Sequence, residues 1–114
     1  MPFKNKEDER IWQKKHDQLP KVRFRHYKKD AKKRGLIFEL TYNEFLKLIN
    51  GVCYYCGGNG YGIDRLDSSF GYLKDNVVPC CSVCNRMKYT YTEDEFIEKC
   101  IKIVNFKLHK KIGR

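Results

Sequence analysis

The chain has 114 residues, the size of one small domain. Its 24 Lys and Arg side chains outnumber 14 Asp and Glu, and its mean hydropathy is −0.70, which excludes a membrane-spanning segment and favours a polyanionic partner. Residues 1–35 carry a net charge of +8, residues 36–79 a net −2 and residues 80–114 a net +4. We therefore expect basic ends that hold nucleic acid around a central site; the alternative is a solvated basic surface.

The first region, residues 1–35, is basic and is predicted to be helical. Residues 4–19 favour a helix that Pro20 interrupts, and residues 21–34 favour a second helix that ends at Gly35. The cations of the second helix repel one another unless phosphates lie nearby, so we expect it to contact a DNA backbone. A solvated helix whose aromatic residues pack on the core is the other interpretation. The candidate contacts are Arg23, Arg25, Lys28, Lys29, Lys32, Lys33 and Arg34.

The second region, residues 36–114, mixes strand and helix patterns. Residues 36–40 are expected to be a short strand or connector, and residues 42–49 a helix that starts with a Thr41–Glu44 capping box. Two antiparallel strands, 63–67 and 76–79, then precede a short helix over about 81–88. A long helix begins after Thr92, with Glu95 as its capping partner. It carries an apolar stripe of Phe96, Ile97, Cys100, Ile101, Val104 and Leu108.

Two residues outside that stripe, Ile103 and Phe106, suggest a homodimer. Cys100 lies on the stripe itself and is expected in the core.

Two Cys-x2-Cys pairs, Cys53/Cys56 and Cys81/Cys84, are separated by 24 residues. Each short loop presents two thiolates, and four thiolates close a tetrahedral structural Zn²⁺ site with no open position for a reacting water. The alternative is a disulfide framework, which is disfavoured because the sequence has no signal peptide and is Lys-rich. Cys80 is a poorer ligand candidate than Cys81 because its spacing to Cys84 is longer.

Polar residues inside this cysteine frame predict a second metal site. Asp64 lies early in the first strand and Asn85 directly after the last cysteine, so a hairpin followed by a helix can bring them together. A carboxylate and an amide oxygen suit a hard ion such as Mg²⁺. Asn76 is expected to bond across the loop rather than to the ion. Ordinary turn and cap chemistry is the alternative for all three.

The segment from Cys53 to Lys88 resembles the HNH nuclease motif, the ββα-metal fold, in its four-cysteine form. The similarity covers roughly residues 22–100 and includes the lead-in of small HNH proteins from phages and large DNA viruses; the phage endonuclease VII type is similar. It implies a metal-dependent nuclease with Asp64 and Asn85 as ligands of Mg²⁺ or Mn²⁺. The residues that carry it are Cys53, Cys56, Asp64, Arg65, Asn76, Cys81, Cys84 and Asn85.

One residue departs from the family pattern: Arg65 stands where the family has its histidine base. Arginine stays protonated, so it cannot take a proton from water, although it can neutralise a phosphate. Three accounts remain open. Asp67 or a metal-bound hydroxide generates the nucleophile, or a histidine such as His26 reaches the site, or the domain binds without cleaving. His26 on a surface helix and Asp67 as a turn cap are the simpler interpretations.

We therefore predict an α+β fold in one domain, residues 1–114: a basic helical part (1–35), then a zinc-stapled, treble-clef-like ββα-metal core with a C-terminal helix (36–114). The predicted function is a DNA endonuclease with structural Zn²⁺ and catalytic Mg²⁺ or Mn²⁺. Its predicted catalytic residues are Asp64, Arg65, Asn76 and Asn85, and Arg86 and Lys88 are expected phosphate contacts.

The alternative function is a non-catalytic DNA- or RNA-binding zinc protein. The expected partner is nucleic acid in the form of double-stranded DNA, no membrane association is expected, and the expected location is inside the host cell.

Overall fold

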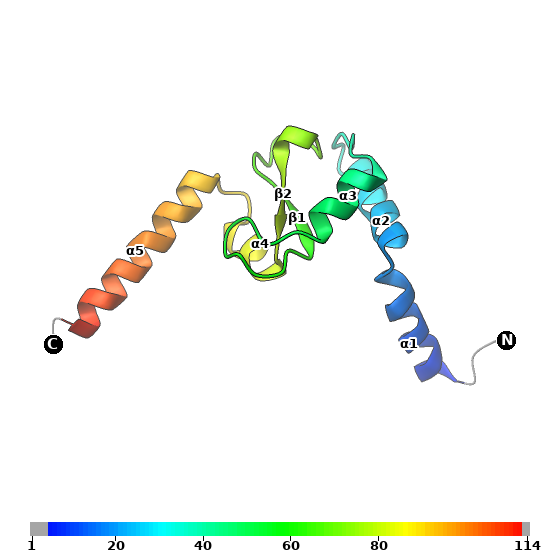
Figure 1. The fold of residues 1–114 in the computed structure, drawn as a ribbon, viewed down its shortest axis with the longest axis horizontal. Coiled ribbons are helices and arrows are strands. Elements are labelled where there is room, and N and C mark those ends of the chain that lie inside the picture. The colour runs from blue at the N-terminus through cyan, green and yellow to red at the C-terminus, as the bar shows by residue number, and fades with distance from the viewer. Residues whose placement is uncertain (1–4, 113–114) are drawn as a thin grey trace.

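The computed structural model describes residues 5–112, and within them the chain forms a mixed α+β fold of five α-helices and one two-stranded antiparallel sheet. The β1–β2–α4 unit lies at the centre, with α2 and α3 on one side and α5 on the other (Figure 1). The elements in order are α1 (Lys6–Asp17), α2 (Pro20–Lys33), α3 (Tyr42–Ile49), β1 (Gly62–Arg65), the 3₁₀ turn η1 (Lys74–Asn76), β2 (Val77–Cys80), α4 (Ser82–Lys88) and α5 (Glu93–Ile112).

The two N-terminal helices follow the sequence signals and confirm the helical prediction for this region. The Asn5 side chain caps α1 by accepting a hydrogen bond from the Asp8 N–H at 2.9 Å. Helix α2 begins at Pro20, where the missing proline N–H costs nothing because the first helical N–H groups have no partner within the helix. Gly35 follows α2 with φ +71°, the left-handed conformation that glycine adopts readily.

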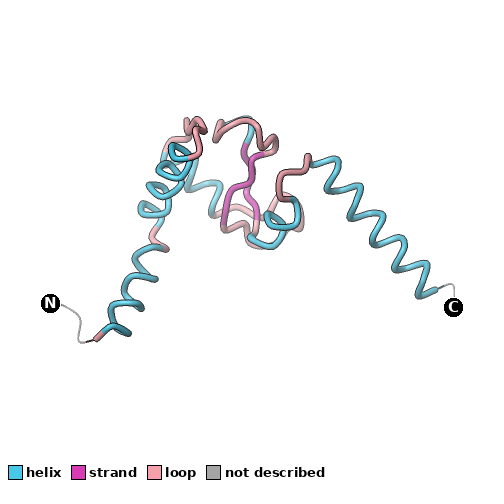
Figure 2. The backbone as a smooth tube through the Cα atoms, turned by 180° about the vertical axis from the view of Figure 1, so that it is seen from behind, coloured by secondary structure: helices cyan, strands magenta, loops and turns pink. Residues whose placement is uncertain are grey.

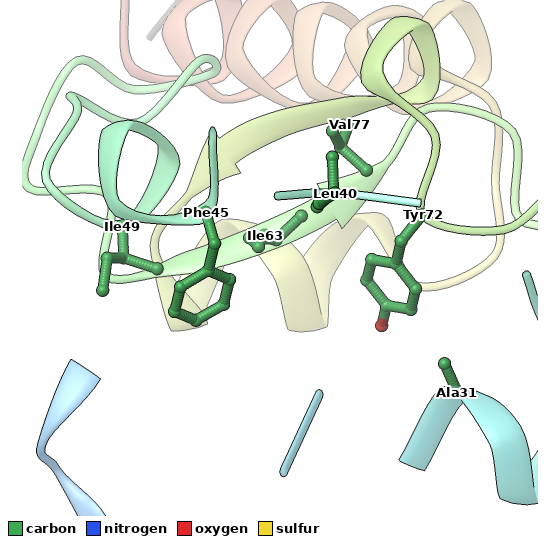
Figure 3. Packing of buried hydrophobic residues seen from close by; sticks show 7 residues of the cluster. All are labelled: Ala31, Leu40, Phe45, Ile49, Ile63, Tyr72 and Val77. Carbon is green, nitrogen blue, oxygen red and sulfur yellow. The ribbon is translucent and has the colours of Figure 1, made fainter. Parts of the chain in front are cut away.

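The hydrophobic core lies where α2 and α3 cover the sheet (Figure 3). Phe45 of α3 is fully buried and packs edge-on against Phe24 and Tyr27 of α2, with ring centroids 5.3 and 5.4 Å apart. The capping box predicted for α3 is present, since the Thr41 hydroxyl accepts from the Glu44 N–H and the Glu44 carboxylate accepts from the Thr41 N–H. The buried residues of the cluster are Ala31, Leu40, Phe45, Ile49, Ile63, Tyr72 and Val77.

The sheet is a short hairpin whose register pairs Asp64 with Val78 and Arg65 with Val77. The strand bounds differ from the predicted 63–67 and 76–79: β1 begins one residue earlier and already ends at Arg65, and β2 is shifted by one residue to Val77–Cys80 because Asn76 belongs to the 3₁₀ turn before it. Of the two options for residues 36–40, the structure forms a connector with a single parallel bridge between Phe38 and Tyr72. Gly71 permits this approach, because a Cβ there would lie 2.3 Å from the Ile37 carbonyl oxygen.

Helix α5 runs away from the core after its first turns, as Figures 1 and 2 show. The chain is therefore elongated, with a radius of gyration of 18.1 Å, against about 13 Å for a compact domain of this length. The capping box of Thr92 and Glu95 is present, and Phe96 is buried. The prediction that Cys100 lies in the core is wrong, since it is only partly buried.

The apolar stripe of α5 is exposed beyond Phe96: Ile101, Val104 and Leu108 are each at least half exposed. The homodimer stays a prediction. No helix within residues 5–112 combines the length and the apolar character needed to cross a membrane.

Candidate functional site

The four predicted zinc ligands converge: the sulfur atoms of Cys53, Cys56, Cys81 and Cys84 all lie within 4.8 Å of one another. The Sγ atoms of Cys56 and Cys81 are 3.8 Å apart. Metal–sulfur bonds of 2.3 Å at the corners of a tetrahedron place neighbouring sulfurs about 3.8 Å apart, so this spacing matches a tetrahedral zinc site. The four cysteines can therefore hold a metal ion such as Zn²⁺, as predicted.

The backbone around these sulfurs favours the thiolate that a metal requires. Burial raises the pKa of the Cys53 thiol, but interactions with the backbone of Cys56, Cys81 and Tyr55 and with the Cys56 side chain outweigh burial and lower its pKa to about 6. Cys81 caps α4, where its sulfur accepts from the Cys84 N–H at 3.4 Å. Hydrogen bonds from backbone N–H groups to thiolates orient the ligands before an ion is bound.

Cys80 adjoins Cys81 and packs with Cys53 and Cys84, but it is not one of the four converging ligands. It is fully buried, and its thiol donates a hydrogen bond to the Cys81 carbonyl at 3.3 Å. Burial raises the pKa of the Cys80 thiol to about 12, so it stays protonated. The sequence-based choice of Cys81 over Cys80 as the ligand agrees with this geometry.

Asp64 lies in the middle of β1 in a buried polar network that the sequence did not reveal. Its carboxylate is 4% exposed and accepts a hydrogen bond from the Tyr55 hydroxyl at 2.7 Å. The Lys88 ammonium, fully buried, lies 3.3 and 3.4 Å from the two Asp64 oxygens and donates to the Arg65 carbonyl at 3.2 Å. Burial, followed by the bond to Asp64, raises the pKa of the Tyr55 hydroxyl.

The prediction that Lys88 is a surface phosphate contact is therefore wrong. A signal for its burial was present in the sequence: Lys88 follows Cys84 by four residues, so both lie on the inward face of α4. Tyr55 lies in the first cysteine loop beside Tyr54, and no sequence pattern distinguishes the two. In the structure its ring also packs edge-on against Phe96 of α5, with centroids 5.3 Å apart.

Asp64 and Asn85 line one open pocket of about 430 Å³, named here the Asp64 pocket. The Asn85 side chain on α4 donates to the Ile63 carbonyl at 3.4 Å through its amide nitrogen, so this bond does not use its Oδ1 oxygen. Three guanidinium groups border the same pocket, so it combines oxygen ligands with positive charge. Its polar and aromatic lining includes Arg34, Asp64, Arg65, Asn85, Arg86 and Tyr89.

Asn76 bonds across the loop, as expected, rather than into the pocket. Its amide oxygen accepts from the Asp67 N–H at 2.9 Å, and its amide nitrogen donates to the carbonyls of Asp67 and Gly71, each at 3.0 Å. The side chain thereby closes the loop between β1 and β2 with three hydrogen bonds. A neutral amide with both donor and acceptor groups is required for this pattern.

Arg65 lines the pocket and also holds the loop after β1 in place through hydrogen bonds. Its Nη1 donates to the carbonyls of Ser68 and Phe70 at 2.6 and 2.9 Å, and its guanidinium lies 5.6 Å from the centre of the Tyr72 ring. Only part of the guanidinium is used in these contacts, since it carries five N–H donors. The remaining donors are available to an anion in the pocket.

Neither alternative base is directed into the Asp64 pocket. Asp67 is a turn cap: its carboxylate accepts from the Ser69 N–H at 2.9 Å and from the Ser69 hydroxyl at 2.5 Å, and these bonds lower its pKa. His26 is exposed on α2 and borders a separate hollow with Lys29, Asp30 and Lys33. Among the described residues, no histidine lines the Asp64 pocket.

The remaining predicted phosphate contacts lie on the surface. Arg23 is partly buried and donates to the Tyr61 carbonyl, whereas the others on α2 are exposed. Arg34, just after α2, joins this basic surface to the Asp64 pocket and pairs with Asp30 at 3.2 Å. The predicted phosphate contacts that are exposed are Arg25, Lys28, Lys29, Lys32, Lys33, Arg34 and, on α4, Arg86.

The chain is similar to two proteins of viruses. It is 38% identical over 96 residues to the uncharacterized protein R423 of Acanthamoeba polyphaga mimivirus, an alignment covering 81% of this chain and 18% of that protein. It is 30% identical over 95 residues to an uncharacterized 29.0 kDa protein in the dda-modA intergenic region of Enterobacteria phage T4, covering 74% and 38%. The chain thus spans less than two fifths of either relative. No family model and no solved structure matches it.

Proposed function

We propose that this chain is an HNH-type endonuclease domain that hydrolyses phosphodiester bonds in DNA. One observation carries the proposal: Asp64 of β1 and Asn85 of α4 line the same pocket, together with three arginines. Oxygen ligands beside clustered cations suit a phosphodiester whose charge must be neutralised on several sides. The similarity to a phage protein and a mimivirus protein fits the phage and viral character expected from the sequence.

The ligand types of the Asp64 pocket fit Mg²⁺ or Mn²⁺, which prefer carboxylate and amide oxygens. Asp64 bonds to Lys88 and Tyr55, but each carboxylate oxygen carries two lone pairs, so the group can also face an ion. Asn85 offers its Oδ1. An ion held there would stabilise the negative charge that develops on the phosphodiester during cleavage.

In this proposal the three arginines of the pocket bind the phosphodiester from different positions. Arg86 on α4 and Arg34 after α2 are exposed, so both can pair with phosphate oxygens. Arg65, fixed by the loop carbonyls, presents its remaining donors from the pocket wall. The exposed cations of α2 extend this positive surface and would hold the DNA backbone without reading its sequence.

A second candidate function is nucleic-acid binding without cleavage, for DNA or RNA. Two observations favour it. Both oxygens of Asp64 already contact the Lys88 ammonium, and Arg65 occupies the position where a base is needed. A domain that only binds could use the same arginines and the same four-cysteine centre.

Plasmid nicking separates these functions. Zinc-loaded protein is incubated with supercoiled DNA in Mg²⁺ or Mn²⁺. The same zinc-loaded protein without added Mg²⁺ or Mn²⁺ is the control, and a branched duplex is a second substrate. The nuclease proposal expects metal-dependent nicking that Asn85→Ala abolishes. Binding of both substrates without any cleavage would overturn it in favour of the second candidate.

The choice of variants matters because Asp64 has a structural role. Asp64→Ala would leave the Lys88 ammonium buried without its partner, so loss of activity could reflect misfolding. Asn85→Ala removes the proposed ligand oxygen and one long hydrogen bond, of 3.4 Å, from the Asn85 side chain to the Ile63 carbonyl. Asn43→Ala, on the exposed face of α3, is the matched control and should nick DNA at the wild-type rate.

A further inference from the structure

Tyr89, the residue after α4, adopts a backbone conformation that side chains rarely accept. Its φ is 53° and its ψ −123°, and within residues 5–112 it is the one non-glycine residue with positive φ. The Tyr91 N–H donates to the Lys88 carbonyl at 3.0 Å, so residues 88–91 form a turn with Tyr89 as its first central residue. These angles are those of a type II′ turn, which normally has glycine at that position.

The fold itself gains little from a tyrosine there. The side chain is 71% exposed, so its ring contributes little burial to offset the backbone strain. At the other positive-φ positions of the described residues, Gly35 and Gly57, the chain uses glycine. A strained position that keeps a large aromatic ring in solvent indicates a role for the ring in binding.

We propose that Tyr89 is a base-stacking residue, which takes an unpaired nucleobase at the rim of the Asp64 pocket. This inference rests on the proposed function, since it assumes that nucleic acid enters that pocket. Tyr89 lines the pocket with Arg86 and Arg34, so a ring face and phosphate-binding groups lie on one surface. Such a combination holds successive nucleotides by stacking the base and pairing the phosphate.

The ring specifies which nucleic acid is preferred. A phosphate alone gains nothing from an aromatic face, and a base inside a continuous duplex has both faces covered by its neighbours. The ligand is therefore a strand with an accessible base, such as a single strand, a strand end or a branch point. Sequence preference is not expected, because every base has a face that can stack.

Fluorescence anisotropy with three probes tests the assignment: a single-stranded oligonucleotide, an abasic oligonucleotide of equal length and a blunt duplex. Tyr89→Gly should weaken binding of the base-containing strand roughly 5- to 100-fold. It should leave the abasic strand within about twofold of wild type. Tyr89→Phe keeps the ring and should bind like wild type.

Thermal unfolding supplies a second readout that a structural role would not produce. Tyr89→Gly relieves the strained turn, so its melting temperature should rise by a few degrees while its affinity falls. Equal affinity of wild type and Tyr89→Gly for the base-containing strand would overturn the assignment. An equal loss of affinity of Tyr89→Gly for the abasic strand and for the base-containing strand would also overturn the assignment.

The arginine variant separates this inference from the function on which it rests. If Arg86→Ala weakens all three probes but Tyr89→Gly weakens none, the pocket binds nucleic acid and the stacking role is wrong. If the wild-type protein binds none of the probes, the proposed function fails and the stacking role fails with it.

Discussion

Replacing Lys88 by methionine isolates the buried pair at the centre of the molecule. Methionine keeps the unbranched shape and most of the volume of the side chain but removes the ammonium that contacts both Asp64 oxygens. The Asp64 carboxylate, 4% exposed, would lose both contacts to the ammonium and keep the hydrogen bond from the Tyr55 hydroxyl at 2.7 Å. Removing one member of a buried ion pair costs about 3–5 kcal/mol because the remaining charge is uncompensated. A domain of this size has a total stability of only about 5–15 kcal/mol.

Urea unfolding of the zinc-loaded protein measures this cost. Lys88→Met should lower the free energy of unfolding by about 3–5 kcal/mol. Asp64→Asn should destabilise the protein as well, and the double variant should be much more stable than the sum of the two single losses predicts. A loss below about 1 kcal/mol for Lys88→Met, or full additivity, would refute the argument that the pair is buried and mutually dependent.

Divalent ions extend the same experiment to the proposed ion site. If Asp64 can face an ion, Mg²⁺ or Mn²⁺ should recover part of the stability of Lys88→Met, because the ion replaces the missing positive charge. The same ions should change wild-type stability less, since Lys88 already neutralises the carboxylate. Equal responses of the two proteins would contradict this.

Three further outcomes are expected. Chelation of zinc, or Cys84→Ser, should cause cooperative loss of folded structure by circular dichroism, whereas Cys100→Ser, outside the cluster, should not. Thr41→Ala should cost about 1 kcal/mol in urea unfolding, because it removes the cap of α3. The hydrogen bond from the Thr41 N–H is the largest cause that lowers the pKa of the Glu44 carboxyl below its usual 4.5. The ionised Glu44 side chain therefore stabilises the fold above pH 4.5, and this stabilisation is lost as the pH falls through the lowered pKa of the folded protein. The stability difference between wild type and Glu44→Ala should therefore shrink with acidification, and a constant difference would refute this.

Local signals in the sequence predicted most of the elements and the four-cysteine centre. Helix ends were predictable where a specific residue sets them, as at Pro20, Gly35 and the Thr41 cap. The cysteine spacing predicted the convergence of four sulfurs because each pair spans a single short loop. Asn76 was correctly expected to bond within the loop, since an amide at a loop edge usually satisfies nearby backbone groups.

The remaining features depend on contacts between distant segments. Lys88 appeared to be one more surface cation, and only the packing of α4 on β1 places it against Asp64, 24 residues earlier. Tyr55 could not be distinguished from its neighbouring tyrosines for the same reason. The stripe on α5 was correctly periodic, yet periodicity does not say whether another element covers it, and most of it is exposed. The strain at Tyr89 is a property of the turn that no sequence pattern revealed.

The central claim is that the Asp64 pocket holds a divalent ion through Asp64 and Asn85. Electron paramagnetic resonance of Mn²⁺ measures this directly, using zinc-loaded protein with a short DNA oligonucleotide and the oligonucleotide alone as the baseline. Wild type and Asn43→Ala should each bind one Mn²⁺ per chain above the baseline, and Asn85→Ala should lose it. Mn²⁺ binding at the baseline level for wild type, or unchanged binding in Asn85→Ala, would contradict the account.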